Sequence, residues 1–337
     1  MTTGAIDINR YLHQKKPLWN TLAILYTLLG YIGGIALLLP NGWLNVLGVV
    51  LLTHSLLCSA YLAHDFMHSA LFESKAWNVA FGNLMLWLNG GCYARFEDLA
   101  RLHIAHHVNR VDFCRFDLVT FLDAMPASIR SLLLALEWLY FPSLAFLLRL
   151  RSIVAPFWEP DRQNERLRNS LILLIRGGLF ALLAIVSPKA LLLYFVSYIG
   201  MLTVLRFVDA FQHTYEVFPV GSDIPKRDRA HEQANTFSNV VSLRHGWLNL
   251  LLLNFGYHNA HHELMKCPWY SLHELDRDLF NGDEVHYITL PELLGNYHRY
   301  RLSRLYSGQG RGVNDQGDRS LETFYGAIEV SFLVLPA

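Results

Sequence analysis

The sequence predicts an all-α integral membrane protein that has two transmembrane hairpins, about four spans, with interfacial helices and a histidine-rich helical cap on the cytoplasmic side. Three observations lead to this fold class. Charged residues make up only 17% of the 337 residues and hydrophobic residues 53%, whereas about 25% charged residues are usual in a soluble protein. Long apolar segments follow one another in two pairs, each joined by a short turn. Histidine clusters recur beside these segments.

The first pair begins with an apolar segment from Pro17 to Pro40. At roughly 1.5 Å per helical residue this segment is long enough to cross a bilayer. It lacks a small-residue cleavage site, so we expect a retained anchor rather than a signal peptide. The turn Asn41-Gly42 leads into a second apolar segment, residues 43–63. Two spans joined by so short a turn form a hairpin whose outer ends lie on the same side of the membrane.

Two further apolar segments are less suited to spanning. Residues 77–94 are short and end in a pair of glycines, which favours a buried or interfacial helix. Residues 130–150 have charged ends and contain Glu137 and Pro142 in their interior. We therefore expect the second segment to lie at the membrane surface as well.

A second hairpin consists of residues 169–187, the turn Pro188-Lys189 and residues 190–211. No later apolar segment is long enough to span. Residues 307–320 are rich in Gly and Asp and predict a flexible linker. The expected organisation is a cytoplasmic tail at 1–16, a membrane domain at 17–300 and a C-terminal tail at 301–337.

The distribution of basic residues predicts the orientation, because cytoplasmic loops carry an excess of Lys and Arg. The outer turns contain only Lys189. Both termini and the central loop are therefore expected in the cytoplasm, and the expected location is a bacterial inner membrane. The basic residues that precede the first and third spans are Arg10, Lys15, Lys16, Arg162, Arg166 and Arg168.

The chain has 16 histidines, and clusters of them fall on this same predicted side. Their spacings of three and four residues place the rings of each cluster on one helix face. Asp209 precedes one of them by a helical turn and is a tenth candidate ligand. The clustered residues are His64, His68, His103, His106, His107, His213, His258, His261 and His262.

Ten candidate ligands exceed what one metal centre takes, but they suit two centres with about four to six ligands each. Imidazole binds iron, copper and zinc, so the ligand type alone does not select the metal. Single histidines such as His54 are interpreted as hydrogen-bonded or solvated residues. The four cysteines are too widely spaced for a disulfide framework, and the net charge of zero disfavours nucleic acid as a partner.

Three of the clusters read HDFMH, HIAHH and HNAHH, in that order along the chain, and the third lies in NFGYHNAHHE before PWY. This set resembles the membrane-bound fatty acid desaturase family over about residues 44–290. The resemblance implies an enzyme with two iron ions that uses O2 to introduce a double bond into a fatty acyl chain, linked as a thioester or a lipid. It also implies electrons from an external donor such as ferredoxin or cytochrome b5. No fused cytochrome b5 signature is present, so a separate donor protein is expected.

Several alternatives stay open at this point. A hydroxylase of fatty acyl chains or lipids, or a carotenoid-type oxygenase, would use the same metal site. A non-catalytic metal-binding or transport protein is disfavoured, because only His54 and Arg176 lie near the middle of spans. Polar residues that flank the clusters are either partners of ring N–H groups or ordinary loop caps. These flanking residues are Asp65, Asn109, Asp112, Asn254 and Asn259.

Overall fold

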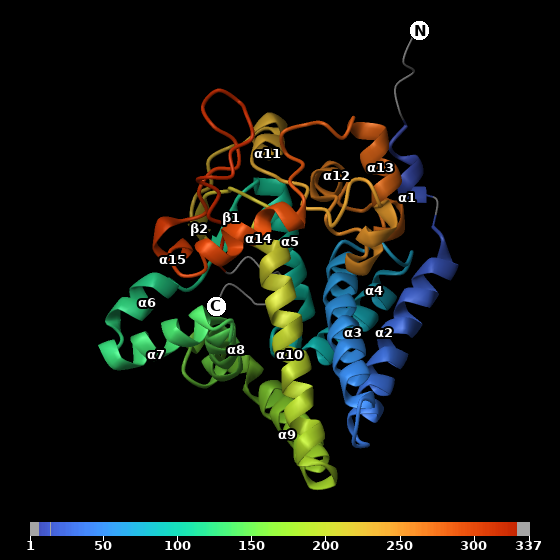
Figure 1. The fold of residues 1–337 in the computed structure, drawn as a ribbon, viewed down its shortest axis with the longest axis vertical. Coiled ribbons are helices and arrows are strands. Elements are labelled where there is room, and N and C mark those ends of the chain that lie inside the picture. Colours follow the sequence, from blue (N-terminus) through green and yellow to red (C-terminus); the bar gives the residue numbers. More distant parts are fainter. Residues whose placement is uncertain (1–6, 14, 329–337) are drawn as a thin grey trace.

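The computed structural model describes residues 7–13 and 15–328; the parts of the expected tails at 1–6, 14 and 329–337 lie outside the described residues. The chain is mostly helical, with two long hairpins below a broad cap (Figure 1). The α-helices are α1 (Arg10–His13), α2 (Pro17–Leu38), α3 (Leu44–Met67), α4 (Lys75–Asn89), α5 (Phe96–Asn109), α6 (Leu118–Ala124), α7 (Ala127–Trp138), α8 (Ser143–Val154), α9 (Arg166–Val186), α10 (Pro188–Asp209), α11 (Arg229–Ala234), α12 (His258–Glu263), α13 (Leu272–Leu279), α14 (Leu290–Arg299) and α15 (Arg304–Ser307). The strands are β1 (Asp112–Cys114) and β2 (Val217–Pro219), and short 3-10 turns are η1 (Gly91–Tyr93), η2 (Ala155–Phe157), η3 (Pro160–Glu165), η4 (Gly246–Leu252) and η5 (Trp269–Ser271).

Four helical segments of the described chain are long and apolar enough to cross a membrane, as the sequence predicted: α2, α3, Pro160–Val186 and α10. The turn of the second hairpin has favourable chemistry at a helix end. In α10, the Ser187 hydroxyl accepts a hydrogen bond from the Ala190 amide at 3.2 Å, and Pro188 occupies the first helical position. The spans α3 and α10 continue several residues toward the cap, so that candidate ligands stand on or directly after the same helices as the spans.

Helices α2 and α3 pack closely because glycines line their contact. A Cβ atom at Gly30 would lie 2.2 Å from the Ser55 hydroxyl, and one at Gly34 would lie 2.9 Å from the Leu52 Cβ. Small residues allow such backbone approach in membranes, where tight packing replaces the hydrophobic effect between helices. The inner half of α3 is consequently buried, and its last turn has a defined position beneath the cap.

The segment predicted to lie at the membrane surface, residues 130–150, forms two helices and not one. Helices α7 and α8 are bent by 118° at the break between them. Pro142 stands directly before α8, and the Glu137 carboxylate accepts a hydrogen bond from the Leu144 amide at 2.6 Å. This carboxylate satisfies one of the open amides at the α8 N-terminus. The bend rules out one straight span and agrees with an interfacial position.

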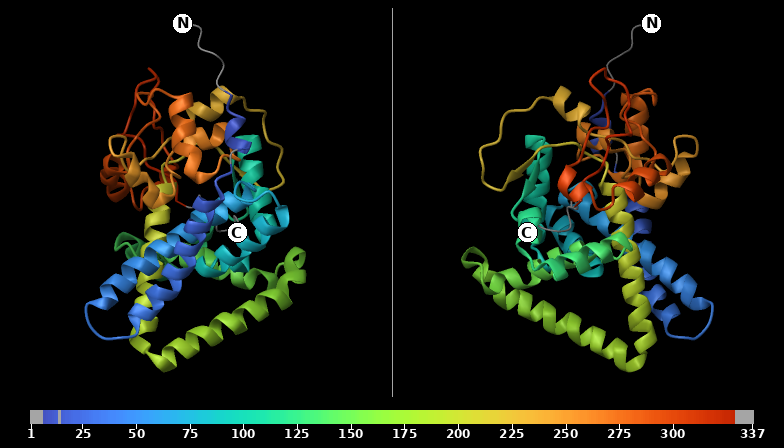
Figure 2. Two further views of the ribbon diagram at one scale, coloured as in Figure 1. Left: turned by 90° about the vertical axis from the view of Figure 1, so that its right-hand side faces the viewer. Right: turned by 60° about the vertical axis from the view of Figure 1, so that its left-hand side comes forward.

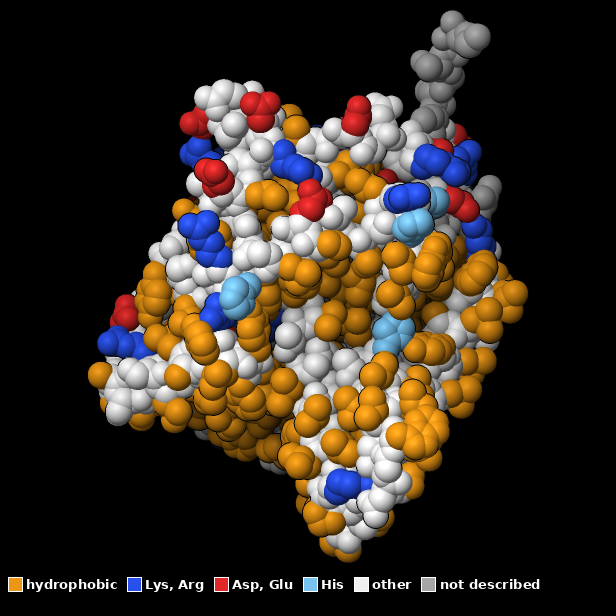
Figure 3. Space-filling model, in the orientation of Figure 1, with side chains coloured by type: hydrophobic (Ala, Val, Ile, Leu, Met, Phe, Trp, Pro, Cys, Tyr) orange, Lys and Arg blue, Asp and Glu red, His pale blue; other side chains and the backbone are white. Residues whose placement is uncertain are grey.

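The cap contains α5, α11 to α15 and the parallel pair of β1 and β2 (Figure 2). Charged side chains gather on the cap, whereas the lower part of the molecule is covered mainly by hydrophobic side chains (Figure 3). Residues 307–320, predicted to be a flexible linker, contact the cap. Gly310 forms a bridge with Phe324, whose buried ring packs with Phe211 and Phe237. An aromatic anchor just after the Gly-rich segment therefore ties the segment to the cap.

Candidate metal centre

Three helices and one loop bring the nine clustered histidines together under the cap. His64 lies in the last turn of α3, and His68 is the residue that ends this helix. The second cluster lies on α5 and the third on α12, while His213 follows α10. All nine side chains are buried or nearly buried in the described structure. Sequence segments almost 200 residues apart therefore supply one site.

Unusual backbone conformations direct the chain into the third cluster. Leu253 and Asn254 have φ angles of 47° and 56°, a left-handed conformation that is costly for residues other than glycine. The Asn254 side-chain amide donates to the Trp269 carbonyl at 3.0 Å, and the Trp269 amide donates to Asp65 at 3.0 Å. These bonds connect the approach to α12 with the end of α3.

The first of two histidine groups consists of residues from α3, α5 and α12. The Nε2 atoms of His68 and His103 lie 2.9 Å apart, and those of His103 and His107 lie 3.2 Å apart. The Nε2 atoms of His107 and His261 are also 3.2 Å apart. One nitrogen from each member lies within 4.8 Å of the others in the set His64, His68, His103, His107 and His261.

The second group lies beside the first and is centred on His213. The Nε2 atom of His213 lies 2.9 Å from that of His262 and 3.0 Å from that of His258. His106 joins this group, because its ring centroid is 4.6 Å from that of His213. The ring centroids of His107 and His262 are only 4.2 Å apart, so His107 connects the two groups. Nine histidines thus divide into adjoining sets of five and four.

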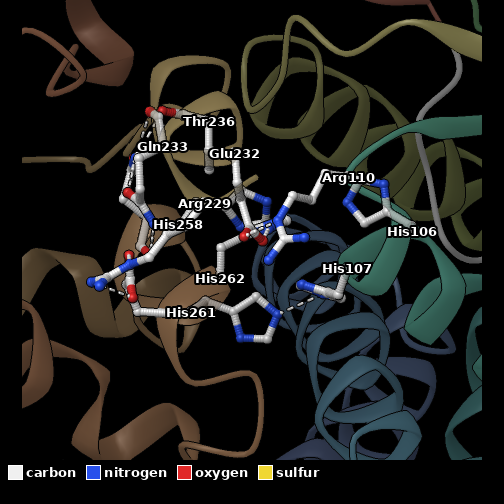
Figure 4. A network of polar contacts seen from close by, with 12 residues as sticks. His106, His107, Arg110, Arg229, Glu232, Gln233, Thr236, His258, His261 and His262 are labelled. Carbon is white, nitrogen blue, oxygen red and sulfur yellow. Dashed lines mark hydrogen bonds and ion pairs between the residues drawn. The ribbon is translucent and has the colours of Figure 1, made fainter. Parts of the chain in front are cut away.

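Carboxylates contact the other ring nitrogen of several histidines. Figure 4 shows one of them, Glu232, beside His262 and Arg110. The Nδ1 atom of His262 lies 3.0 Å from Glu232, which also accepts a hydrogen bond from Arg110 at 2.7 Å. The Nδ1 atom of His106 lies 3.0 Å from Asp112. The same Nδ1 atom of His106 has the Val111 carbonyl as a hydrogen-bond acceptor at 2.9 Å. A ring that donates from Nδ1 to a carboxylate or carbonyl oxygen exposes a lone pair at Nε2, which is the arrangement of a metal-binding histidine.

Burial favours neutral imidazoles in the site. Loss of solvent and the nearby rings hold the pKa of His68, His107 and His213 well below the usual value. The pKa of His261 is lowered to about 3, mainly by burial. Neutral rings at physiological pH offer lone pairs to a cation without first losing a proton.

The flanking residues named from the sequence divide into two kinds. Asp65 lies 3.3 Å from Nδ1 of His64, and Asp112 contacts His106, so both meet a ring nitrogen. Asn109 instead donates to the Ala105 carbonyl in its own helix. The Asn259 amide donates to the Thr236 carbonyl at 2.8 Å and so attaches α12 to the segment after α11. Asn254 supports the backbone as described above.

Asp209 is buried in the last turn of α10, but the close sets of possible ligands do not include it. Asp112 instead joins such a set with His106 and His213. The tenth candidate from the sequence therefore differs from the carboxylate that the fold brings nearest to the second group.

Glu232 and Tyr215 contact the site but were not singled out in the sequence. The Tyr215 ring stacks on that of His213 with a centroid distance of 4.5 Å, and its hydroxyl bonds to Thr236 at 2.8 Å. Glu232 stands in a polar segment without a distinguishing pattern. The only available signal is its position between the fourth span and the third cluster, which is too general to identify it.

The arrangement fits bound metal cations. Neutral imidazoles whose Nε2 lone pairs face one another at about 3 Å repel unless a cation or a proton lies between them. The donor set of buried imidazoles, with carboxylates behind some of the rings, suits a borderline transition metal better than magnesium or calcium, which prefer oxygen. The histidines of both groups could therefore hold metal.

Comparison with known proteins agrees with this geometry. No curated protein matches the chain. The sequence model of the family described as fatty acid desaturase matches residues 41–293, which include the second to fourth spans and all nine clustered histidines. This family consists of membrane oxidoreductases whose members act on fatty acyl chains. Because the match covers most of the sequence, the chain belongs to the fatty acid desaturase family.

Proposed function

We propose that this protein is an oxygen-dependent desaturase with two irons that introduces a double bond into a fatty acyl chain. The observation that supports this most is the division of nine buried imidazoles into two adjoining groups directly above four apolar helices. Unactivated C–H bonds offer no carbonyl or leaving group, so acid–base catalysis alone would not break them. When bound, two iron ions supply the required redox chemistry with O2 as co-substrate.

The overall reaction balances as follows. Two hydrogens leave adjacent carbons of the acyl chain, and a donor supplies two electrons while two protons come from solvent. One O2 accepts all four electrons and becomes two waters. The proposed ligands are the nine clustered histidines, and Glu232, Asp112 and Asp65 would orient their rings. Asp209 is proposed to act indirectly, by orienting His213 or through water.

The predicted orientation is part of the proposal: the cap and both termini face the cytoplasm of a bacterial inner membrane. A separate protein such as ferredoxin or cytochrome b5 would then deliver electrons from that side, and the acyl chain, as a thioester or a lipid, would enter from the bilayer. Cysteine labels at Asn41 and Lys189 should react from outside, whereas labels at the exposed Lys226 and Lys266 should not. Outside labelling at Lys266 contradicts this orientation.

A hydroxylase is the second candidate, because the same site could insert oxygen in place of removing hydrogen. Lipid mass spectrometry of cells with and without the protein separates the two. We expect fatty acyl chains that have lost two hydrogens. Chains that have gained one oxygen would establish hydroxylation, and unchanged lipids in cells that contain iron-loaded protein with a working donor would contradict both.

A further inference from the structure

A small basic pocket is lined by residues of α10, of the bend between α7 and α8, and of the C-terminal helices, and by none of the nine clustered histidines. Its lining includes three arginines and one carboxylate: Arg206, Arg301, Arg304 and Glu137. The lining therefore carries more positive than negative charge. Asp209 is one turn further along α10 and does not line the pocket.

The single lining carboxylate already has partners. One oxygen of Glu137 accepts hydrogen bonds from the Leu144 amide and the Ser143 hydroxyl at the start of α8. The other oxygen accepts a hydrogen bond from Arg206 at 2.8 Å. Glu137 thus closes the bend and neutralises Arg206, and it contributes little to the charge of the other two arginines.

Arg301 and Arg304 are held by carbonyl groups and not by carboxylates. Arg301 donates from Nε to the Trp138 carbonyl at 3.0 Å, and Arg304 donates from Nε to the Tyr300 carbonyl at 3.1 Å. Among the described residues neither forms an ion pair with an acidic side chain. Arg304 is only 5% exposed. Burial and the nearby Arg206 lower its pKa to about 10, so that it stays charged at neutral pH.

The residues around the pocket indicate that its arginines lie at the level of the membrane surface. Arg206 belongs to the last turn of the span α10. Beside the pocket, Trp138, Leu139 and Phe141 in the bend between α7 and α8 expose 53%, 65% and 37% of their surface. Exposed aromatic side chains next to arginines are typical of the zone where lipid headgroups meet the hydrocarbon.

We propose that this pocket binds the phosphate of an anionic phospholipid headgroup, with Arg301 and Arg304 as its main donors. A phosphate diester offers oxygens to two guanidinium groups at once, whereas both oxygens of the lining carboxylate, Glu137, already accept hydrogen bonds from Arg206 and from the start of α8. The acyl chains of the same lipid would lie along the exposed apolar surface of the bend. This inference does not depend on the metal site or on the reaction.

The test measures lipid retention by native mass spectrometry of the full-length, metal-loaded protein from detergent. The probes are phosphatidylglycerol, uncharged diacylglycerol, oleate and inorganic phosphate. We expect wild-type protein to retain phosphatidylglycerol, and Arg301→Gln to bind it about five- to tenfold more weakly. The double variant Arg301→Gln/Arg304→Gln should bind phosphatidylglycerol more weakly still. The variant Arg301→Lys, which keeps the positive charge, should bind it more tightly than Arg301→Gln. Added salt should also weaken binding.

Arg299→Gln is the matched control, because Arg299 is an exposed arginine at the end of α14 that does not line the pocket. It should retain the lipid, and metal content should be equal in all variants. If proteins that carry Arg304→Gln do not fold, the retention of phosphatidylglycerol by Arg301→Gln alone tests the proposal. Equal retention by Arg301→Gln and wild type overturns the proposal. Retention of oleate or diacylglycerol equal to that of phosphatidylglycerol also overturns it. Displacement of the lipid by millimolar inorganic phosphate would overturn it as well, because it would indicate a site for the free anion.

Discussion

The two histidine groups differ in what holds them. The first group stands on α3, α5 and α12, and α3 is fixed by close glycine packing against α2. The second group takes His213 from a loop, and carboxylates contact two of its rings, His262 and His106. Tyr215 stacks on His213 as well. In the first group, one carboxylate has a corresponding position, since Asp65 lies 3.3 Å from the Nδ1 atom of His64. The comparison therefore indicates that the group that includes a loop residue has more carboxylate contacts to its rings, two against one.

The largest effect is expected where the two groups meet. Because His107 belongs to the first group and also forms a close set with His106 and His262 of the second group, His107→Ala should disturb both metal positions and abolish turnover. Iron analysis of the purified variant should show loss at both positions. His54→Ala is a suitable control, since His54 lies on α3 and bonds to the Leu251 carbonyl, outside both groups. A His107→Ala protein that keeps its full iron and activity would show that the two groups are not joined.

Substitutions in single groups should separate them. His68→Ala affects only the first group and His213→Ala only the second, so each should abolish turnover but remove about one iron of two. Both variants should remain in the membrane fraction, because neither residue contributes to the apolar surface of a span. Retention of both irons and substantial activity in His213→Ala would remove that residue from the ligand set.

Glu232→Gln tests the polar support of the second group. The amide can still accept from His262 but loses the charge that also pairs with Arg110, so iron affinity or turnover should fall about 10- to 100-fold. Glu263→Gln is the matched control, because Glu263 follows His262 directly but pairs with Arg229. Equal loss in both variants would point to general destabilisation of the cap.

The smallest effect is expected for Asp209→Asn. Asp209 lies outside the close ligand sets, and an amide can still orient a neighbour or bind water. We expect partial activity, measured by acyl-chain analysis, with iron content unchanged. Complete loss of one iron in Asp209→Asn, with normal insertion, would instead make this carboxylate a direct ligand.

The spans and histidine clusters could be predicted because both depend on local patterns: apolar length for the four long helices and three- or four-residue spacing for the rings. The division into five and four could not be predicted, since it depends on how α3, α5, α12 and the loop after α10 are arranged in three dimensions. Glu232 reaches His262 through tertiary packing across 30 residues. The contacts of residues 307–320 with the cap could not be predicted for the same reason, because they depend on the buried Phe324 packing with Phe211 and Phe237.

The central claim is that two metal ions occupy the two groups, and metal analysis tests it most directly. Protein purified without oxygen from cells supplied with iron should contain about two irons per chain, because nine imidazoles in two adjoining sets exceed one centre. The fully loaded sample should be the active one. Active protein that contains one metal ion per chain, or stoichiometric zinc without iron, would contradict the account.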